Sequence, residues 1–316
     1  MEKLAITNPS RRNFVSTAVK AALGAYALTA IAPANIWAAP AVAPGSKIRL
    51  GFQTYLWGKD WDVPTIITNL TKADLKYVEL RTSDKYAHGL EITLSPAERK
   101  EYKKRFADSP VKIISVASAA QMDEEDEVKF RTAIDTVKKH IILAKDVDAP
   151  SVRVFPNKWH PGVPREKTIA RIAQALNEVG AYAADHGILI GLEEHGPVGE
   201  LPVLRKILDQ VPQRSVGIKL NCERRALEGE GFEANFNLIK HRLSNTLHLK
   251  NVKDTTFPYQ LMVDLLVKAD WDGVACFEYT HEVPDKVAAL IEHREIWEGM
   301  VAKAMKTYKS ASGKAG

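Results

Sequence analysis

The chain contains little of several features that identify protein classes. It has only two cysteines, Cys222 and Cys276, among 316 residues, so a disulfide-rich scaffold is excluded. Both lie near the ends of expected strands that are not neighbours, and we expect them to be small buried residues rather than a pair. The 18 glycines and 16 prolines are too few for a disordered chain. No glycine-rich loop follows the first expected strand, which argues against a dinucleotide-binding sheet.

The first forty residues differ in character from the rest of the chain. Arg11 and Arg12 precede an alanine-rich apolar segment, and small residues follow at Ala38 and Ala39. This order is typical of a secretory leader, and the arginine pair favours the twin-arginine route. We therefore expect residues 1–41 to be a twin-arginine signal peptide and the protein to be periplasmic or otherwise exported. A membrane anchor is the alternative, but the apolar segment is short and contains Lys20, so no stable anchor is expected after cleavage.

Excess charge is also small once the leader is set aside. The formal net charge of the whole chain is +5. The expected leader carries four basic residues and one acidic residue, so its removal leaves +2. A charge of this size gives no reason to expect a nucleic-acid partner.

Apolar runs and helical patterns alternate eight times along the mature chain. The expected strands cover 48–56, 77–82, 111–119, 151–156, 188–194, 215–221, 246–251 and 273–279. The expected helices cover 62–74, 95–107, 124–147, 165–186, 200–210, 232–243, 258–269 and 283–304. This alternation predicts an α/β fold, a (β/α)8 TIM barrel, as a single domain over 46–305 after the signal peptide. A flexible C-terminal tail is expected over 306–316, and a homo-oligomer is compatible with the sequence.

The fifth expected strand is an apolar run that ends in two carboxylates and a histidine before a glycine, LEEHG at 192–196. Side chains alternate along a strand, so Glu193 and His195 share one face while Glu194 takes the other. In parallel α/β folds the carboxyl ends of the strands carry the chemistry. We therefore predict that Glu193 points into the mouth of the barrel.

Equivalent positions on the next three strands are also polar: Asn221, His248 and Glu278. Together with Glu193 they supply oxygen ligands and one nitrogen from four consecutive strands. Such a set suits Mn²⁺ or Mg²⁺ and tolerates Co²⁺ or Zn²⁺. The sequence thus predicts a divalent-metal site made of these four residues.

The segments LEEHG, GIKLN, LHLKN and CFEYT, on eight βα units behind a twin-arginine leader, resemble the sugar phosphate isomerase/epimerase family with xylose isomerase-like TIM barrels. The resemblance implies that Glu193, Asn221, His248 and Glu278 bind one divalent metal. It also implies that Glu193 and Glu278 move protons on the sugar. The resemblance covers essentially the whole mature chain.

The sixth strand departs from the family pattern. The family has an aspartate followed by a histidine three residues later, where this chain has Asn221 and Arg224. An amide carries no charge, so metal affinity should fall. Lys219 is also expected to point inward, paired with Glu193 or Glu278, and to lower or remove the demand for a metal. Arg224 is a candidate for binding an anionic or hydroxyl-rich substrate.

Other candidate substrate-binding residues lie around the same mouth. They are His195, Lys250, Glu79, Arg81 and His160. Glu79 and Arg81 share the inward face of the second strand, where they either contact substrate or neutralise each other. Lys250 follows His248 on the same face and could polarise a carbonyl.

Proton abstraction beside a carbonyl of a sugar or keto-sugar, assisted by a metal or an ammonium group, is the chemistry that such a site predicts. The expected activity is that of an isomerase or epimerase with a small carbohydrate substrate. One alternative is a lyase or dehydratase that eliminates from a 3-keto-glycoside or an inosose-type substrate. A non-catalytic sugar-binding barrel is a second alternative. A nuclease with three metals on the same fold lacks the necessary histidine and aspartate ligands here.

Overall fold

A computed structural model describes residues 47–82 and 85–312 of the chain. The strands are β1 (Ile48–Gln53), β2 (Tyr77–Arg81), β3 (Lys112–Gln121), β4 (Ser151–Phe155), β5 (Leu189–Glu193), β6 (Val216–Lys219), β7 (Thr246–Leu249) and β8 (Gly273–Phe277). The helices are α1 (Val63–Lys72), α2 (Pro96–Ala107), α3 (Glu127–Asp146), α4 (Arg165–Asp185), α5 (Leu201–Leu208), α6 (Phe232–Ile239), α7 (Tyr259–Lys268) and α8 (Lys286–Ser312). Two short 3-10 helices, η1 (Arg224–Leu227) and η2 (Lys240–Arg242), precede α6 and β7. The expected signal peptide, 1–41, lies outside the described residues.

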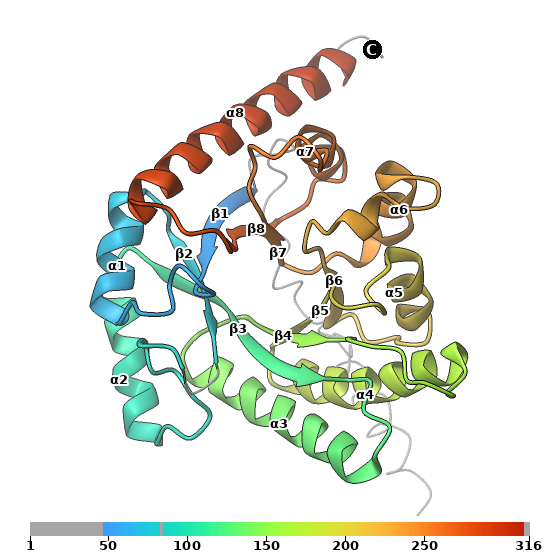
Figure 1. The fold of residues 1–316 in the computed structure, drawn as a ribbon. Coiled ribbons are helices and arrows are strands. Elements are labelled where there is room, and N and C mark those ends of the chain that lie inside the picture. The colour runs from blue at the N-terminus through green and yellow to red at the C-terminus, as the bar shows by residue number, and fades with distance from the viewer. Residues whose placement is uncertain (1–46, 83–84, 313–316) are drawn as a thin grey trace, which may run out of the picture. The chain divides into compact units, whose positions relative to one another are not determined.

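The eight parallel strands form a barrel that the helices surround, which confirms the predicted TIM barrel (Figure 1). The strands pair in the order β6-β5-β4-β3-β2-β1-β8-β7. Each runs in the same direction, so their carboxyl ends meet at one end of the barrel. Polar residues that end different strands are therefore brought together, although they lie far apart in the sequence.

Local sequence signals explain where the helices begin. Ser95 and Glu98 form a reciprocal capping box at the start of α2, and the Asp126 side chain accepts the Lys129 backbone N–H at the start of α3. The last helix continues past the expected boundary at residue 305 to Ser312, so most of the expected tail is helical. The reason is that neither glycine nor proline occurs between residue 305 and Gly313.

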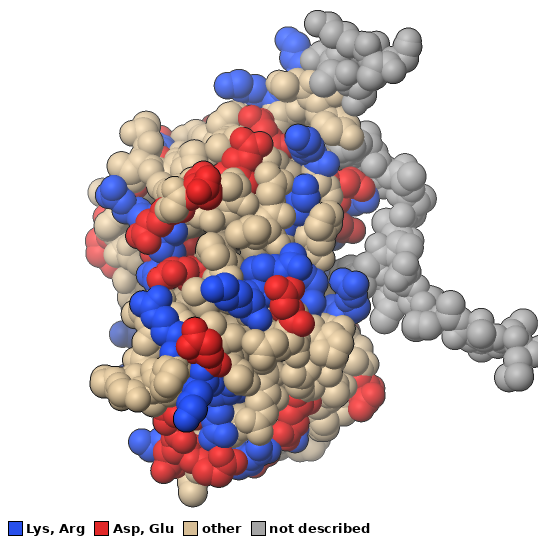
Figure 2. Space-filling view, turned by 90° about the vertical axis from the view of Figure 1, so that its right-hand side faces the viewer, with Lys and Arg blue, Asp and Glu red and all other residues tan. Residues whose placement is uncertain are grey.

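One side of the barrel carries charges of both signs. Figure 2 shows basic and acidic side chains interspersed over the side on which α5 and α6 lie in Figure 1. Within 47–82 and 85–312, no helix is long and apolar enough to cross a membrane. Cys222 and Cys276 are both buried and free, as the sequence predicts.

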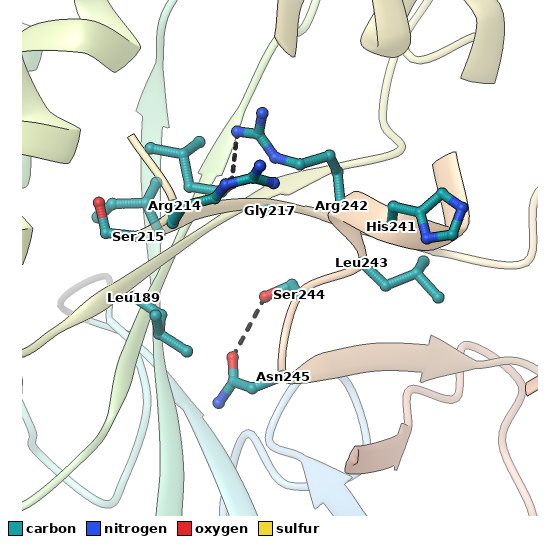
Figure 3. Close-up of a pocket in the computed structure, with 11 residues that line it drawn as sticks. Leu189, Arg214, Ser215, Gly217, His241, Arg242, Leu243, Ser244 and Asn245 are labelled. Carbon is teal, nitrogen blue, oxygen red and sulfur yellow. Dashed lines mark hydrogen bonds between the residues drawn. The ribbon is translucent and has the colours of Figure 1, made fainter. Parts of the chain in front are cut away.

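One seam of the barrel is closed differently from the others. No ladder pairs β6 with β7 in the described chain; a single bridge joins Ile218 of β6 to Leu243, which precedes β7, and the Arg242 guanidinium donates to backbone carbonyls that include that of Val216 (3.0 Å). Figure 3 looks into the pocket at this seam, with Gly217, Arg242 and Ser244 labelled. A Cβ on Gly217 would lie 3.0 Å from the backbone of Ser244, so only glycine allows the two segments to approach this closely.

Candidate active site

The four residues predicted to converge at the barrel mouth lie around one atom, Nδ1 of His248. Nδ1 is 3.1 Å from Oδ1 of Asn221, 3.6 Å from Oε2 of Glu193 and 3.5 Å from Oε2 of Glu278. The other ring nitrogen, Nε2, lies 2.7 Å from Oε1 of Glu79. His248 is completely buried, and these neighbours lie against both nitrogens of its ring.

Three ion pairs fill the interior of the barrel beneath and around this point. They are Lys219–Glu79, Arg153–Glu193 and Lys250–Glu278, and we refer to them as the three internal ion pairs. In the first two, both side chains are at most 2% exposed. In the third, Lys250 is 28% exposed and Glu278 6%. Only the third pair can therefore be reached from solvent.

These charges set the ionisation of the buried carboxylates. Burial by itself raises the pKa of Glu79, but Lys219 and His248 outweigh it and hold that pKa well below the usual range. Burial likewise opposes ionisation of Glu278, and His248 and Lys250 lower its pKa to about 2. Burial lowers the pKa of the Lys250 ammonium, but the carboxylate of Glu278 raises it by more. Both members of the third pair are charged at neutral pH.

Lys219 points inward as predicted, but its partner differs from the expected one. It bonds Glu79 on the opposite side of the barrel and the Thr246 hydroxyl at 3.0 Å, rather than Glu193 or Glu278. Glu79 accordingly does not neutralise Arg81. The fully buried Glu79 lies beneath the mouth, where it holds Lys219 and His248 in place.

Arg153 is the site residue that the sequence reasoning missed. It is 1% exposed, its Nη1 donates to Oε2 of Glu193 at 2.9 Å, and its guanidinium lies 3.9 Å from the centre of the Phe155 ring. A signal was present, because Arg153 is the single charged residue in the otherwise apolar strand SVRVF. A charge in such a strand requires a buried partner.

Besides Lys250, two more of the predicted substrate-binding residues, His195 and Arg81, lie at the mouth. The His195 ring packs against Phe155, 4.2 Å between centroids, and its buried Nδ1 has no hydrogen-bond partner among the described residues. Gly196 behind it has a φ of 64°, and a Cβ there would lie 2.0 Å from the Asn157 carbonyl oxygen, so the turn after Glu194 requires glycine. The Arg81 guanidinium stacks over the Tyr55 ring at 4.6 Å.

The remaining two candidates lie further out. Nε2 of His160 is 3.1 Å from Oδ2 of the buried Asp123, a partner that the sequence did not reveal. Arg224 is exposed, at the start of η1. Its neighbour Arg225 instead contacts the β5 end, where it donates to the Gly196 carbonyl.

Glu194 turns away from the mouth, as alternation predicts, and its carboxyl group contacts backbone. One oxygen accepts the Asn221 backbone N–H at 2.9 Å, and the other is buried and has no hydrogen-bond partner within 47–82 and 85–312. Burial raises the pKa of Glu194 to about 8. The residue is thus a neutral acid that holds Asn221 in position at neutral pH.

Replacing this acid by its neutral amide, Glu194→Gln, should stabilise the protein at alkaline pH. The folded-state pKa exceeds that of the unfolded chain, so the wild type loses stability as pH rises from about 4.5 to about 8, whereas glutamine does not titrate. We expect the variant to match the wild type at pH 4.5 and to exceed it by on the order of 3–5 kcal/mol at pH 8–9. Urea unfolding across this range measures the difference. The exposed Glu125→Gln is the control, and a constant offset across the range would contradict the assignment.

The four predicted ligands do not fit a divalent metal in this arrangement. Their separations are of the right order, but the carboxylate oxygens that face His248 Nδ1 are the same atoms that Arg153 and Lys250 already bond. Asn221 adds no charge. Within the described part of the chain, no group of three or more His, Cys, Asp or Glu side chains is arranged to hold a metal ion.

A family model described as a xylose isomerase-like TIM barrel matches residues 67–300. No curated protein matches the sequence.

Solved structures with the same fold include two sugar epimerases. An L-ribulose 3-epimerase is 13% identical, with a TM-score of 0.72 over 84% of this chain and 98% of its own. A 3-keto-D-glucoside 4-epimerase from E. coli is 11% identical, with a TM-score of 0.67 over 80% and 99%. A xylose isomerase-like TIM barrel protein from Mycobacterium smegmatis, in complex with magnesium, is 15% identical, with a TM-score of 0.63 over 84% and 100%. At these identities the likeness establishes the fold.

Proposed function

Because the chain belongs to the xylose isomerase-like TIM barrel family, we propose that it is a sugar isomerase or epimerase. In this proposal it moves a proton next to the carbonyl of a sugar or keto-sugar. The names of two structural neighbours, an L-ribulose 3-epimerase and a 3-keto-D-glucoside 4-epimerase, support the substrate class.

The observation that carries the proposal is the Lys250–Glu278 pair at the barrel mouth. Glu278 is ionised and can accept a proton, and the Lys250 ammonium beside it can donate a hydrogen bond. Removal of a C–H proton beside a carbonyl places negative charge on the carbonyl oxygen. The step requires a base that takes the proton and a positive charge that stabilises the oxygen. Glu278 and Lys250 lie side by side, and Lys250 is partly open to solvent, so the pair meets both requirements.

Proton balance in the proposed step is simple. Glu278 takes the proton from the carbon beside the carbonyl, and the C–H electron pair forms the double bond of an enediolate. Lys250 stabilises the oxygen that gains the charge. Isomerisation returns the proton to the former carbonyl carbon, while the proton of the adjacent hydroxyl moves to the former carbonyl oxygen, so that the carbonyl group changes place. Epimerisation returns a proton to the original carbon from a donor on its opposite face.

Exchange with solvent deuterium tests this proposal. We expect the purified protein to catalyse incorporation of deuterium from D₂O into the carbon beside the carbonyl of at least one free ketose or keto-glycoside, detected by mass spectrometry and NMR. The unchanged mass of the product, apart from deuterium, distinguishes isomerisation from elimination, which loses water or an aglycone. Absence of exchange across the panel would leave a non-catalytic binding barrel and overturn the proposal.

Export bears on the substrate. The twin-arginine sequence at Arg11 and Arg12 supports the proposal that the protein acts outside the cytoplasm on free, rather than phosphorylated, sugars. A matched pair of free and phosphorylated ketoses in the exchange assay checks this. Activity confined to the phosphorylated member would contradict it.

A further inference from the structure

We infer that the proposed reaction uses no tightly bound divalent metal, and that the Lys250 ammonium supplies the positive charge instead. The inference rests on the proposed function for its chemistry, but the charge arrangement that supports it is independent of any substrate. The inference differs from the metal site that the sequence predicts, because cations of the protein already pair with the two glutamates of that site.

The charges inside the barrel are already balanced without a metal ion. The interior of the barrel contains the three internal ion pairs, in which each of three carboxylates has its own cation. A divalent ion among them would leave two positive charges without counter-charges in a buried region. Buried uncompensated charge is strongly unfavourable, so the site already holds the charge that it can accommodate.

Arg153 occupies the carboxylate that the sequence predicts as a metal ligand on β5. It bonds the Glu193 oxygen that faces His248, and both side chains are at most 2% exposed. The guanidinium is fixed by its position over the Phe155 ring and cannot be replaced by solvent. Glu193 is therefore held by a permanent cation, and Arg153 is a positioning residue that keeps this carboxylate from serving as a metal ligand.

The amide of Asn221 is also engaged in hydrogen bonds. Its Nδ2 donates to Oε1 of Glu223 at 3.2 Å, and this contact turns Oδ1 toward Nδ1 of His248 at 3.1 Å. Both ends of the amide thus have partners, and the orientation is set by the carboxylate. The position where the family has an aspartate contributes a neutral hydrogen-bonding group here.

Solvent exposure distinguishes the cation that can contact a substrate. Among the three internal ion pairs, Lys219 and Arg153 are at most 1% exposed and cannot touch a substrate, whereas Lys250 is 28% exposed. Lys250 also lies 4.0 Å from Glu223, which is on the loop after β6. The same comparison separates the two candidate bases, because Glu278 accompanies the open cation and Glu193 the closed one.

The test combines metal analysis with a variant that restores negative charge. Wild-type protein, purified without chelator, is assayed for metal content and titrated with Mn²⁺, Mg²⁺, Co²⁺ and Zn²⁺ by calorimetry. In the variant R153M/N221D, Glu193 loses its cation and residue 221 gains a carboxylate, so the site carries two more negative charges. The variant R171M/N177D makes the same charge change on α4, outside the barrel, and is the matched control.

We expect wild-type protein and the R171M/N177D control to contain far less than one metal per chain and to show no saturable binding. R153M/N221D should bind one divalent ion about 100-fold more tightly than the weakest binding that the titration detects, since ligand charge tunes cation affinity over orders of magnitude. Solvent exchange by the wild type should survive dialysis against EDTA. One tightly bound metal per wild-type chain, or exchange that EDTA abolishes and a metal restores, would overturn the inference.

A misfolded R153M/N221D variant would not remove the test, because the metal content of the wild type decides the inference alone. Absence of exchange with every sugar would overturn the proposed function. The metal titrations would still decide whether the site is metal-free, so the two failures are distinguishable.

Discussion

Glu278→Gln is expected to lower the rate of solvent proton exchange by about 10²–10⁴-fold, the usual contribution of a positioned base. Glutamine keeps the shape of the side chain but cannot accept a proton. It also leaves Lys250 without its charged partner, so the ammonium is less firmly placed beside the developing oxyanion. Exchange of a ketose proton under single-turnover conditions measures the effect, with thermal unfolding as a check that the variant is folded.

Glu223→Gln is the matched control for this prediction. Glu223 is a second carboxylate near Lys250, 4.0 Å from its Nζ, and it lies on the loop outside the barrel. We expect its replacement to change exchange by less than about tenfold, because it orients Asn221 without holding the proton. If Glu193→Gln abolished exchange while Glu278→Gln left it intact, the base would be Glu193 and the assignment would be wrong.

Lys219→Met should have the largest effect on stability, a loss of about 3–5 kcal/mol in the free energy of unfolding. The substitution keeps the length of the side chain but removes the cation, so the fully buried Glu79 carboxylate is left without its main counter-charge. Thr246 also loses its bond to the ammonium. Urea unfolding at neutral pH measures the difference.

A second substitution isolates the cause. In K219M/E79Q the buried charge is absent, and glutamine still offers an oxygen to His248 Nε2. We expect this double variant to recover most of the stability that K219M loses. The exposed pair Lys253–Glu292 supplies the contrast, and Lys253→Met should cost less than about 1 kcal/mol. A similarly small cost for K219M would show that Glu79 is protonated or solvated rather than paired.

Much of the site could be predicted from the chain because a barrel converts strand order into position. Strands five to eight are buried, largely apolar runs with polar residues in them or directly after them, and parallel strands bring their carboxyl ends to one mouth. Side chains alternate along a strand, so of two adjacent residues only one points inward. This distinguishes Glu193 from Glu194 and predicts that Lys219 points inward. These inferences depend only on neighbours in sequence and on strand direction.

The partner of each inward charge could not be predicted in the same way. Lys219 and Glu79 are 140 residues apart, and Arg153 and Glu193 are 40 apart. Alternation gives the face of a strand but not the height of a side chain in the barrel, which depends on the tilt and register of all the strands together. Asp123, the partner of His160, was missed for the same reason, because it lies on a different loop.

The sequence by itself therefore determined the barrel, the order of its elements and the set of polar groups at its mouth, since these follow from local pattern and repetition. The tertiary structure alone decided how the charges are shared. Lys219 is paired with Glu79, Arg153 with Glu193 and Lys250 with Glu278, and this distribution separates a closed carboxylate from an open one. Pairing is a property of distance across the barrel, and distance across the barrel is set only when all eight strands are in register.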